Sequence, residues 1–159
     1  MLLSVAWANF LIMKRESLFD YDAGFDVSVA GRVLFARYWG TMTTQGLRDF
    51  FADYHQRVQA LDVAPWAEIV DFRQVSLVAP EVFSVATALY SETFCVRHCA
   101  TAYLFSRHTD PRLRLLLQRL EDPQSWGTSC CNFAGDFRPA LNWVNGRLSL
   151  YGEGVQQVR

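Results

Sequence analysis

Positive charge is scarce in this 159-residue sequence, in which 15 Lys and Arg residues stand against 16 Asp and Glu residues, for a formal net charge of −1. Binding to a nucleic-acid backbone requires a clear positive excess, so the composition argues against DNA or RNA as a partner. The apolar opening, residues 1–13, is too short to span a bilayer. Lys14 and Arg15 follow it, whereas the cations of a signal peptide precede the apolar part. We therefore expect a cytoplasmic protein without stable membrane insertion.

Sequence motifs of catalysis are also absent. The sequence contains no glycine-rich loop for a dinucleotide or phosphate, no Gly-x-Ser-x-Gly and no His-Glu-x-x-His. We expect neither an enzymatic activity nor a cofactor. With 51% hydrophobic residues, a chain of this length is expected to form one domain and to bury about two thirds of its unfolded surface.

A metal site is not predicted either. The candidate ligands are Cys95, His98, Cys99, Cys130 and Cys131, and their spacing matches no common zinc template. Free cysteines are among the most buried residue types, so we interpret these as reduced thiols of a cytosolic core. Adjacent cysteines in a strand point to opposite faces, so at most one of the last two is expected to be accessible.

The segment over residues 67–89 predicts a buried strand, a short loop and a helix in succession. Asp71 and Arg73 are interpreted as the polar carboxyl end of the strand. Pro80 suits the first turn of a helix, where its missing N–H costs nothing, and Glu81 follows where the helix dipole favours a carboxylate. The strand part is rich in β-branched and aromatic residues without alternation, which is typical of a strand covered on both faces: Ile69, Val70, Phe72, Val75, Leu77 and Val78.

Strands and helices are predicted along the rest of the chain. Residues 26–29 and 32–39 form a hairpin that ends at Gly40, and Thr43 or Thr44 caps a helix. The later elements are a strand over residues 101–105, a helix from Asp110-Pro111, a strand over residues 128–133 and a helix capped by Asp136.

Three segments follow from this pattern. Residues 25–146 form the domain, and residues 147–159 form a tail with a weak strand signal at residues 148–151. Residues 1–24 are an N-terminal extension, which is either an additional edge strand or sequence upstream of a true start at Met13.

The order of these elements, the segment VDFRQVSLVAPEVF and the helix FRPALNWV with Ala140 and Trp143 resemble the STAS superfamily, in particular its SpoIIAA-like branch. The resemblance covers residues 25–144. It implies an α/β fold with a mixed sheet of four to five strands, an N-terminal hairpin followed by parallel strands, and about four helices packed on it.

One departure concerns the loop after the central strand. In the antagonist proteins of this family the loop carries a phosphorylated serine, whereas here it contains Ala79, Pro80, Glu81 and Val82. Glu81 is either a constant mimic of phosphoserine or an ordinary glutamate at a helix start. We predict no regulatory phosphorylation at this loop.

The helix over residues 80–94 is apolar around most of its circumference, so it must be covered on more than one side. The cover is either the neighbouring helices or a second molecule, and in the resembling family this region binds the partner. We therefore predict a homodimer or a complex with another protein, formed through Ala79, Pro80, Glu81, Ser84, Thr87 and Ser91.

A competing hypothesis is a small apolar or lipid-like ligand, because 14% of the residues are aromatic. Its pocket would be lined by Tyr38, Trp39, Trp66 and Trp126. A cluster at the start of the third helix could also bind an anion or consist of solvated side chains: Arg107, His108, Arg112 and Arg114.

Overall fold

A mixed five-stranded sheet forms the centre of the computed structural model, which describes residues 23–91, 97–120 and 129–154. The strand order is β1-β2-β3-β4-β5, with an antiparallel β1–β2 pair followed by three parallel pairs. The predicted α/β fold class is confirmed. The strands are β1 (Gly24–Ala30), β2 (Val33–Met42), β3 (Trp66–Val78), β4 (His98–Phe105) and β5 (Ser129–Ala134).

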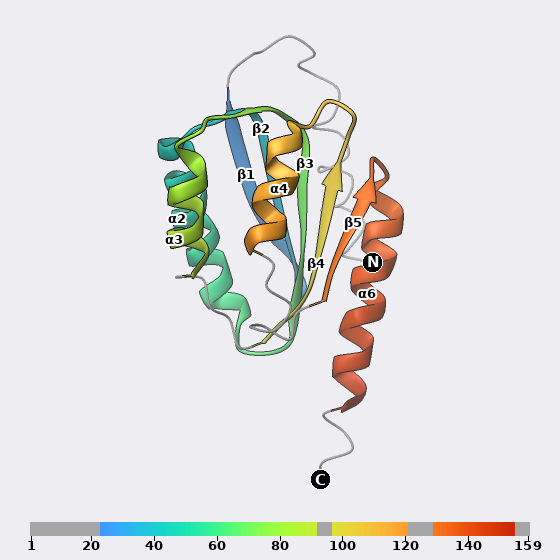
Figure 1. Cartoon of the computed structure of the whole chain (residues 1–159). Helices are drawn as coiled ribbons and strands as arrows, with labels where there is room; N and C mark the ends of the chain where they lie inside the picture. Colours follow the sequence, from blue (N-terminus) through green and yellow to red (C-terminus); the bar gives the residue numbers. More distant parts are fainter. Residues whose placement is uncertain (1–22, 92–96, 121–128, 155–159) are drawn as a thin grey trace.

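The helices lie on both faces of this sheet (Figure 1). One face is covered by α2 (Thr44–Leu61), α3 (Val82–Ser91) and α4 (Pro111–Leu120), and the other by α6 (Phe137–Gly154). Each face therefore has its own apolar core. β3 lies between β2 and β4 and contributes to both cores, which explains its continuous apolar sequence.

Side-chain caps fix the starts of three helices where the sequence predicts them. Thr43 Oγ1 accepts a hydrogen bond from the backbone N–H of Gly46 at 3.1 Å. Asp110 Oδ1 accepts one from the N–H of Arg112 at 3.0 Å, and Asp136 Oδ1 accepts one from Arg138 at 3.1 Å. Each bond satisfies a helical N–H that has no partner inside the helix.

Two strands continue beyond the residues that the sequence analysis interprets as their carboxyl ends. β2 continues past Gly40 to Met42, because Gly40 adopts a φ of +74° at a shift in the β2–β3 register and does not end the strand. β3 continues past Asp71 and Arg73 to Val78. The Arg73 guanidinium binds both carboxylate oxygens of Asp71, at 2.8 and 2.6 Å, so the two charges satisfy each other inside the strand.

The prediction for the C-terminal part is wrong beyond Gly146. Residues 148–151 form neither a tail nor a strand, because α6 continues through them to Gly154. Its last turns extend past the end of the sheet (Figure 1). The predicted N-terminal extension lies outside the described residues except for its last two positions, of which Gly24 is the first residue of β1.

Candidate functional site

Two backbone N–H groups at the end of β3 and the start of the loop to α3 donate hydrogen bonds to neighbouring segments. The N–H of Ala79 donates to the carbonyl of Met42 at 3.0 Å, and the N–H of Val78 donates to Asp110 Oδ2 at 2.7 Å. A correction concerns the helix start, which is Val82 and not Pro80. Pro80 lies in the turn before it, where its carbonyl accepts from the N–H of Phe83 at 3.4 Å. The sequence-based boundary therefore differs by two residues.

The outward side of this turn and helix carries Pro80, Glu81, Ser84, Thr87 and Ala88, all of them exposed, and we call these five residues the α3 surface. Two of its hydroxyl groups donate hydrogen bonds to carbonyls of their own segment. Ser84 Oγ donates to the carbonyl of Glu81 at 3.0 Å. Thr87 Oγ1 donates to the carbonyl of Phe83 at 3.1 Å. The hydroxyl donors are thus already used, and the surface offers mainly carbon to a partner.

The remaining predicted partner-binding positions differ in accessibility. Ala79 is half-buried, and the side chain of Ser91 lies outside the described residues. The inward side of α3 is anchored by Val82 and Ala86, which are 0% and 3% exposed and belong to the core that α3 shares with α2 and α4. The neighbouring elements therefore cover one side of α3 and leave the α3 surface to solvent.

Charge distinguishes α3 from its neighbour α2. The ten residues of α3 contain no acidic or basic side chain, and Glu81 is the single charged group of the α3 surface. The exposed side of α2 carries Arg48, Asp49 and Arg57. An exposed helix face usually bears charge, so the neutral face of α3 is unusual for a surface in contact only with water.

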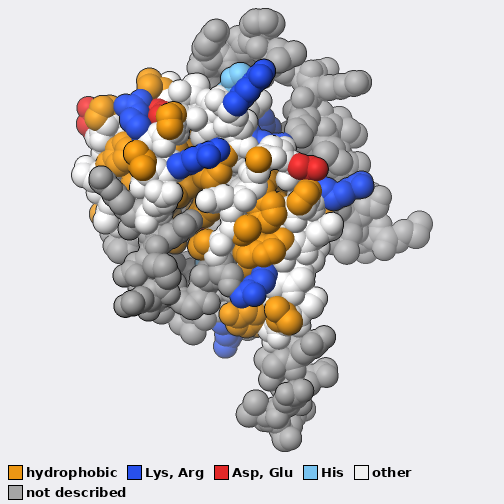
Figure 2. Space-filling view, turned by 45° about the vertical axis from the view of Figure 1, so that its right-hand side comes forward, with side chains coloured by type: hydrophobic (Ala, Val, Ile, Leu, Met, Phe, Trp, Pro, Cys, Tyr) orange, Lys and Arg blue, Asp and Glu red, His pale blue; other side chains and the backbone are white. Residues whose placement is uncertain are grey.

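The four predicted anion-binding side chains do not converge. Arg112 is bound to the carboxylate of Asp110, with Nη2 2.8 Å from Oδ2, and the guanidinium of Arg114 lies over the ring of Phe105 at 4.8 Å. Arg107 donates to Nε2 of its neighbour His108 at 3.1 Å. Figure 2 shows basic side chains mostly spread singly over the face it presents, with hydrophobic side chains between them. The interpretation as individually solvated or paired arginines therefore fits the structure better.

The stability of the fold should decrease in acid because of Asp110. Hydrogen bonds from Arg112 are the main reason that the pKa of this carboxyl is lowered from 3.8 to about 2, and the N–H of Val78 contributes. A folded-state pKa below the unfolded one gives stability that is complete above pH 4 and lost as pH falls toward 2. We expect a loss of about 1–2 kcal/mol over this interval, measured by urea unfolding. The Asp110→Asn variant should lack this component, and an identical pH profile for that variant would contradict the assignment.

The structure contains an aromatic-lined cavity, but it is not the pocket predicted from the sequence. Tyr38 lines a cavity of about 70 Å³ between the sheet and α2, α3 and α4. Trp39 and Trp66 are not part of its wall, and Trp126 lies outside the described residues. Trp66 is fully buried elsewhere in the same core, with its indole N–H donating to Asp62 Oδ1 at 3.0 Å. A cavity this small cannot accept an acyl chain unless side chains move, since a cavity of ~150 Å³ is filled by benzene.

One charged residue of the cavity wall was missed by the sequence interpretation. Glu68 is 6% exposed, and its carboxylate accepts hydrogen bonds from the hydroxyl of Tyr54 and from that of Thr101, both at 2.7 Å. His98 Nε2 lies 3.4 Å from Glu68 Oε1, and its ring stacks on Trp66 at a centroid distance of 4.2 Å. The signal in the sequence is a glutamate inside the apolar run of β3.

The structure describes three of the four cysteines, Cys99, Cys130 and Cys131. Cys99 is buried against α6, and burial raises the pKa of its thiol, which keeps the thiol protonated. Cys130 is exposed and Cys131 is half-buried, while Cys95 lies outside the described residues. Within the described ranges no three His, Cys, Asp or Glu side chains lie close enough together to hold a metal ion. Nor does this part of the chain contain a helix with the length and apolarity needed to cross a bilayer.

Solved structures share this architecture. An uncharacterized protein of Shewanella loihica, described as having a SpoIIAA-like fold, superposes with a TM-score of 0.59 at 11% identity, covering 80% of this chain and 99% of that one. The chain has a SpoIIAA-like fold. The unphosphorylated anti-sigma factor antagonist SpoIIAA matches with a TM-score of 0.53 at 16% identity, over 77% of this chain and 97% of that one.

The phosphorylated form of the Bacillus cell fate determinant SpoIIAA gives a TM-score of 0.52 at 15% identity and covers 76% of this chain and 99% of that one. The sequence itself matches no protein family and no curated protein. Identities this low establish the fold of the SpoIIAA-like chain and leave its activity to the chemistry of its own residues.

Proposed function

We propose that this SpoIIAA-like protein is a non-catalytic interaction protein that binds a protein partner through the α3 surface. The observation that carries the proposal is the neutral, exposed face of α3, on which Ser84 and Thr87 direct their hydroxyl groups onto carbonyls of their own segment. Burial of such a face in an interface lowers the free energy, because the face has few polar groups that would lose hydrogen bonds to water.

The comparison structures support a regulatory role for the fold. SpoIIAA is an anti-sigma factor antagonist and has been solved with and without phosphate. The corresponding loop of this chain contains Ala79, Pro80 and Glu81 and so offers no hydroxyl group. We propose that its partner binding is not switched by phosphorylation. Glu81 adds a permanent charge immediately before α3, where the helix dipole favours it, and this position accounts for it without phosphate mimicry.

The partner face should be uncharged as well. A charge brought against Thr87 and Ala88 would lose its water shell and find no opposite charge on α3, at a cost of several kcal/mol. A second copy of the chain meets this requirement through a two-fold symmetric contact, and so does another protein with an uncharged patch. Both occupants follow from the same chemistry and differ in the mass of the complex.

Site-specific crosslinking in cells can test this proposal. A photoreactive benzoylphenylalanine placed at Thr87 should crosslink to a partner at a yield at least fivefold higher than the same group at Gln56, an exposed position of α2. Adding Ser84→Arg should reduce the Thr87 crosslink at least fivefold, because it brings a long side chain into the contact and its guanidinium loses water there. Ser84 is exposed, so the melting temperature should stay unchanged.

The mass of the crosslinked product identifies the occupant, since a doubled mass means a second copy and any other mass a different protein. Equal yields at Thr87 and Gln56, or a crosslink that is insensitive to Ser84→Arg, would contradict binding through the α3 surface. Intact-mass analysis of the same material tests the proposal that phosphorylation does not switch partner binding. Phosphate on Ser76 or Ser84 that changes the crosslink yield would contradict that part of the proposal.

A further inference from the structure

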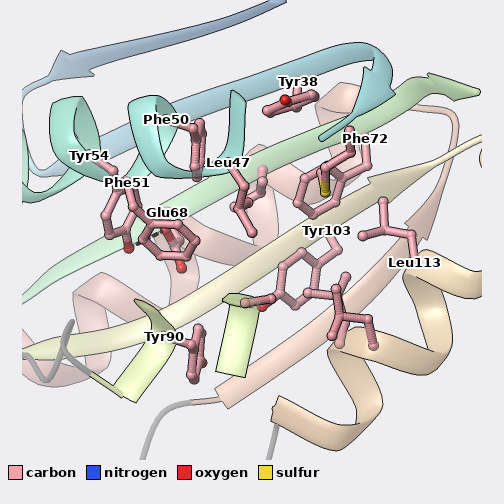
Figure 3. Close-up of a pocket in the computed structure, with 15 residues that line it drawn as sticks. Tyr38, Leu47, Phe50, Phe51, Tyr54, Glu68, Phe72, Tyr90, Tyr103 and Leu113 are labelled. Atoms are coloured by element: carbon pink, nitrogen blue, oxygen red, sulfur yellow. Dashed lines mark hydrogen bonds between the residues drawn. The ribbon is translucent and has the colours of Figure 1, made fainter. Parts of the chain in front are cut away.

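The cavity under α3 has walls of two kinds. Its aromatic side chains come from the sheet, α2 and α3, and Figure 3 shows their rings arranged around the hollow: Tyr38, Phe50, Phe51, Tyr54, Phe72, Tyr90 and Tyr103. The rest of the lining is aliphatic apart from one residue, Glu68, the single charged group of the cavity wall. The site therefore combines many π faces with one carboxylate.

The carboxylate has capacity for another donor. Glu68 Oε2 accepts from Tyr54 and Oε1 accepts from Thr101, whereas two carboxylate oxygens offer about four acceptor positions. Both of these donors are neutral hydroxyl groups. Among the described residues its one ion-pair partner is His98, at 3.4 Å, and no arginine reaches it. Glu68 is 6% exposed and has little compensating charge, so the burial of its negative charge is costly. A positively charged ligand would offset that cost.

The aromatic walls favour the same kind of ligand. The face of an aromatic ring attracts a cation by ~0.5–2 kcal/mol, and several rings around one carboxylate form a cage suited to an ammonium group with methyl substituents. The cavity of about 70 Å³ is roughly half the ~150 Å³ that benzene fills, which limits the ligand to about three or four non-hydrogen atoms. An uncharged ligand of that size would add no compensating charge to the one that His98 can supply to Glu68.

We propose that this cavity binds a small alkylammonium ion, with Glu68 as its counter-ion and the surrounding aromatic rings as its cage. The site is separate from the α3 surface, because Ala86 and Tyr90 contribute to the cavity from the inward side of α3. It does not depend on the protein partner proposed above.

Titration of the full chain followed by amide NMR spectra tests the site. The probes are trimethylammonium chloride and the neutral isopropanol, each with four non-hydrogen atoms, with sodium chloride keeping the ionic strength constant. Trimethylammonium should bind at least tenfold more tightly than isopropanol and should shift the amide signals of Ala86 and Leu113, which line the cavity. Equal affinity for the two probes, or no saturable shift of these signals, would overturn the proposal.

Glu68→Gln is the decisive variant, because it removes the charge and retains a carbonyl acceptor for Tyr54 or Thr101. It should weaken trimethylammonium binding at least tenfold and leave isopropanol binding within twofold. The matched control is Glu81→Gln, which removes an exposed carboxylate and should change neither affinity. Since Glu68→Gln could impair folding, Phe51→Leu provides a second test through loss of one ring, with an expected weakening of at least threefold. Unchanged trimethylammonium affinity in either folded cavity variant would refute the proposal.

Discussion

Replacing Trp66 with alanine should lower the free energy of unfolding by about 3–5 kcal/mol, measured by urea denaturation. Trp66 is 0% exposed at the start of β3, and the indole is held from two sides. Its N–H donates to Asp62 Oδ1 at 3.0 Å, and its ring stacks on His98 at 4.2 Å. Alanine would leave a large void and remove the stacking partner of a histidine that itself lies 3.4 Å from Glu68.

Trp66→Phe is the matched control, because it retains a ring against His98 and loses the indole N–H. It should cost clearly less, about 1–2 kcal/mol. A loss below 1 kcal/mol for Trp66→Ala would mean that the core closes over the void, and the tight packing argued for the amino end of β3 would be wrong.

The elements that sequence analysis located correctly have local signals. Thr43, Asp110 and Asp136 each accept a hydrogen bond from an N–H two or three residues later, so capping can be predicted from neighbours in the chain. The hairpin turn at Gly31 is of the same kind, with a φ of +62° that glycine adopts without strain. The fold class followed from these boundaries together with the apolar pattern of β3.

The predictions of element ends were wrong where the charge or backbone conformation of a residue is accommodated in a way that the residue type does not indicate. Asp71 and Arg73 have the appearance of a polar strand end, yet they neutralise each other and the strand continues. Gly40 accommodates an irregularity between two paired strands and does not mark a turn. The first part of the α6 continuation packs against the sheet, where the half-buried Leu148 joins the core of that face.

The cavity could not have been assembled from the sequence. Glu68 receives hydrogen bonds from Tyr54, 14 positions earlier, and from Thr101, 33 positions later, and no spacing rule connects these residues. The partners are brought together by the parallel pairing of β3 with β4 and by the packing of α2 over both. A buried glutamate in an apolar strand is nevertheless a usable signal, since it requires partners that the rest of the chain must supply.

The α3 surface and the cavity occupy opposite sides of one short helix. Outward, Ser84 and Thr87 offer a neutral face for a partner, and inward, Ala86 and Tyr90 contribute to the wall beside Glu68. What the two sites share is the placement of α3 on the sheet. That placement depends on Val78, the last residue of β3 before the loop. The N–H of Val78 donates a hydrogen bond to the side chain of Asp110.

Replacing Asp110 with alanine should therefore lower the free energy of unfolding by about 2–4 kcal/mol and loosen the β3–α3 loop. The change leaves the buried N–H of Val78 without an acceptor, which costs about 1–3 kcal/mol, and removes the cap of α4, which costs about 0.5–2 kcal/mol. Hydrogen exchange should show faster exchange at Val78.

The ion pair with Arg112 is the smaller part of this effect, because 42% of the Arg112 side chain is exposed and water screens the pair. Arg112→Gln should accordingly cost clearly less than Asp110→Ala and leave exchange at Val78 unchanged. Asp110→Asn, which retains one carbonyl acceptor, should lie between the two. If Arg112→Gln proves as damaging as Asp110→Ala, the carboxylate acts through its charge and not through the backbone of Val78, and the proposed anchoring of α3 by Asp110 would have to be abandoned.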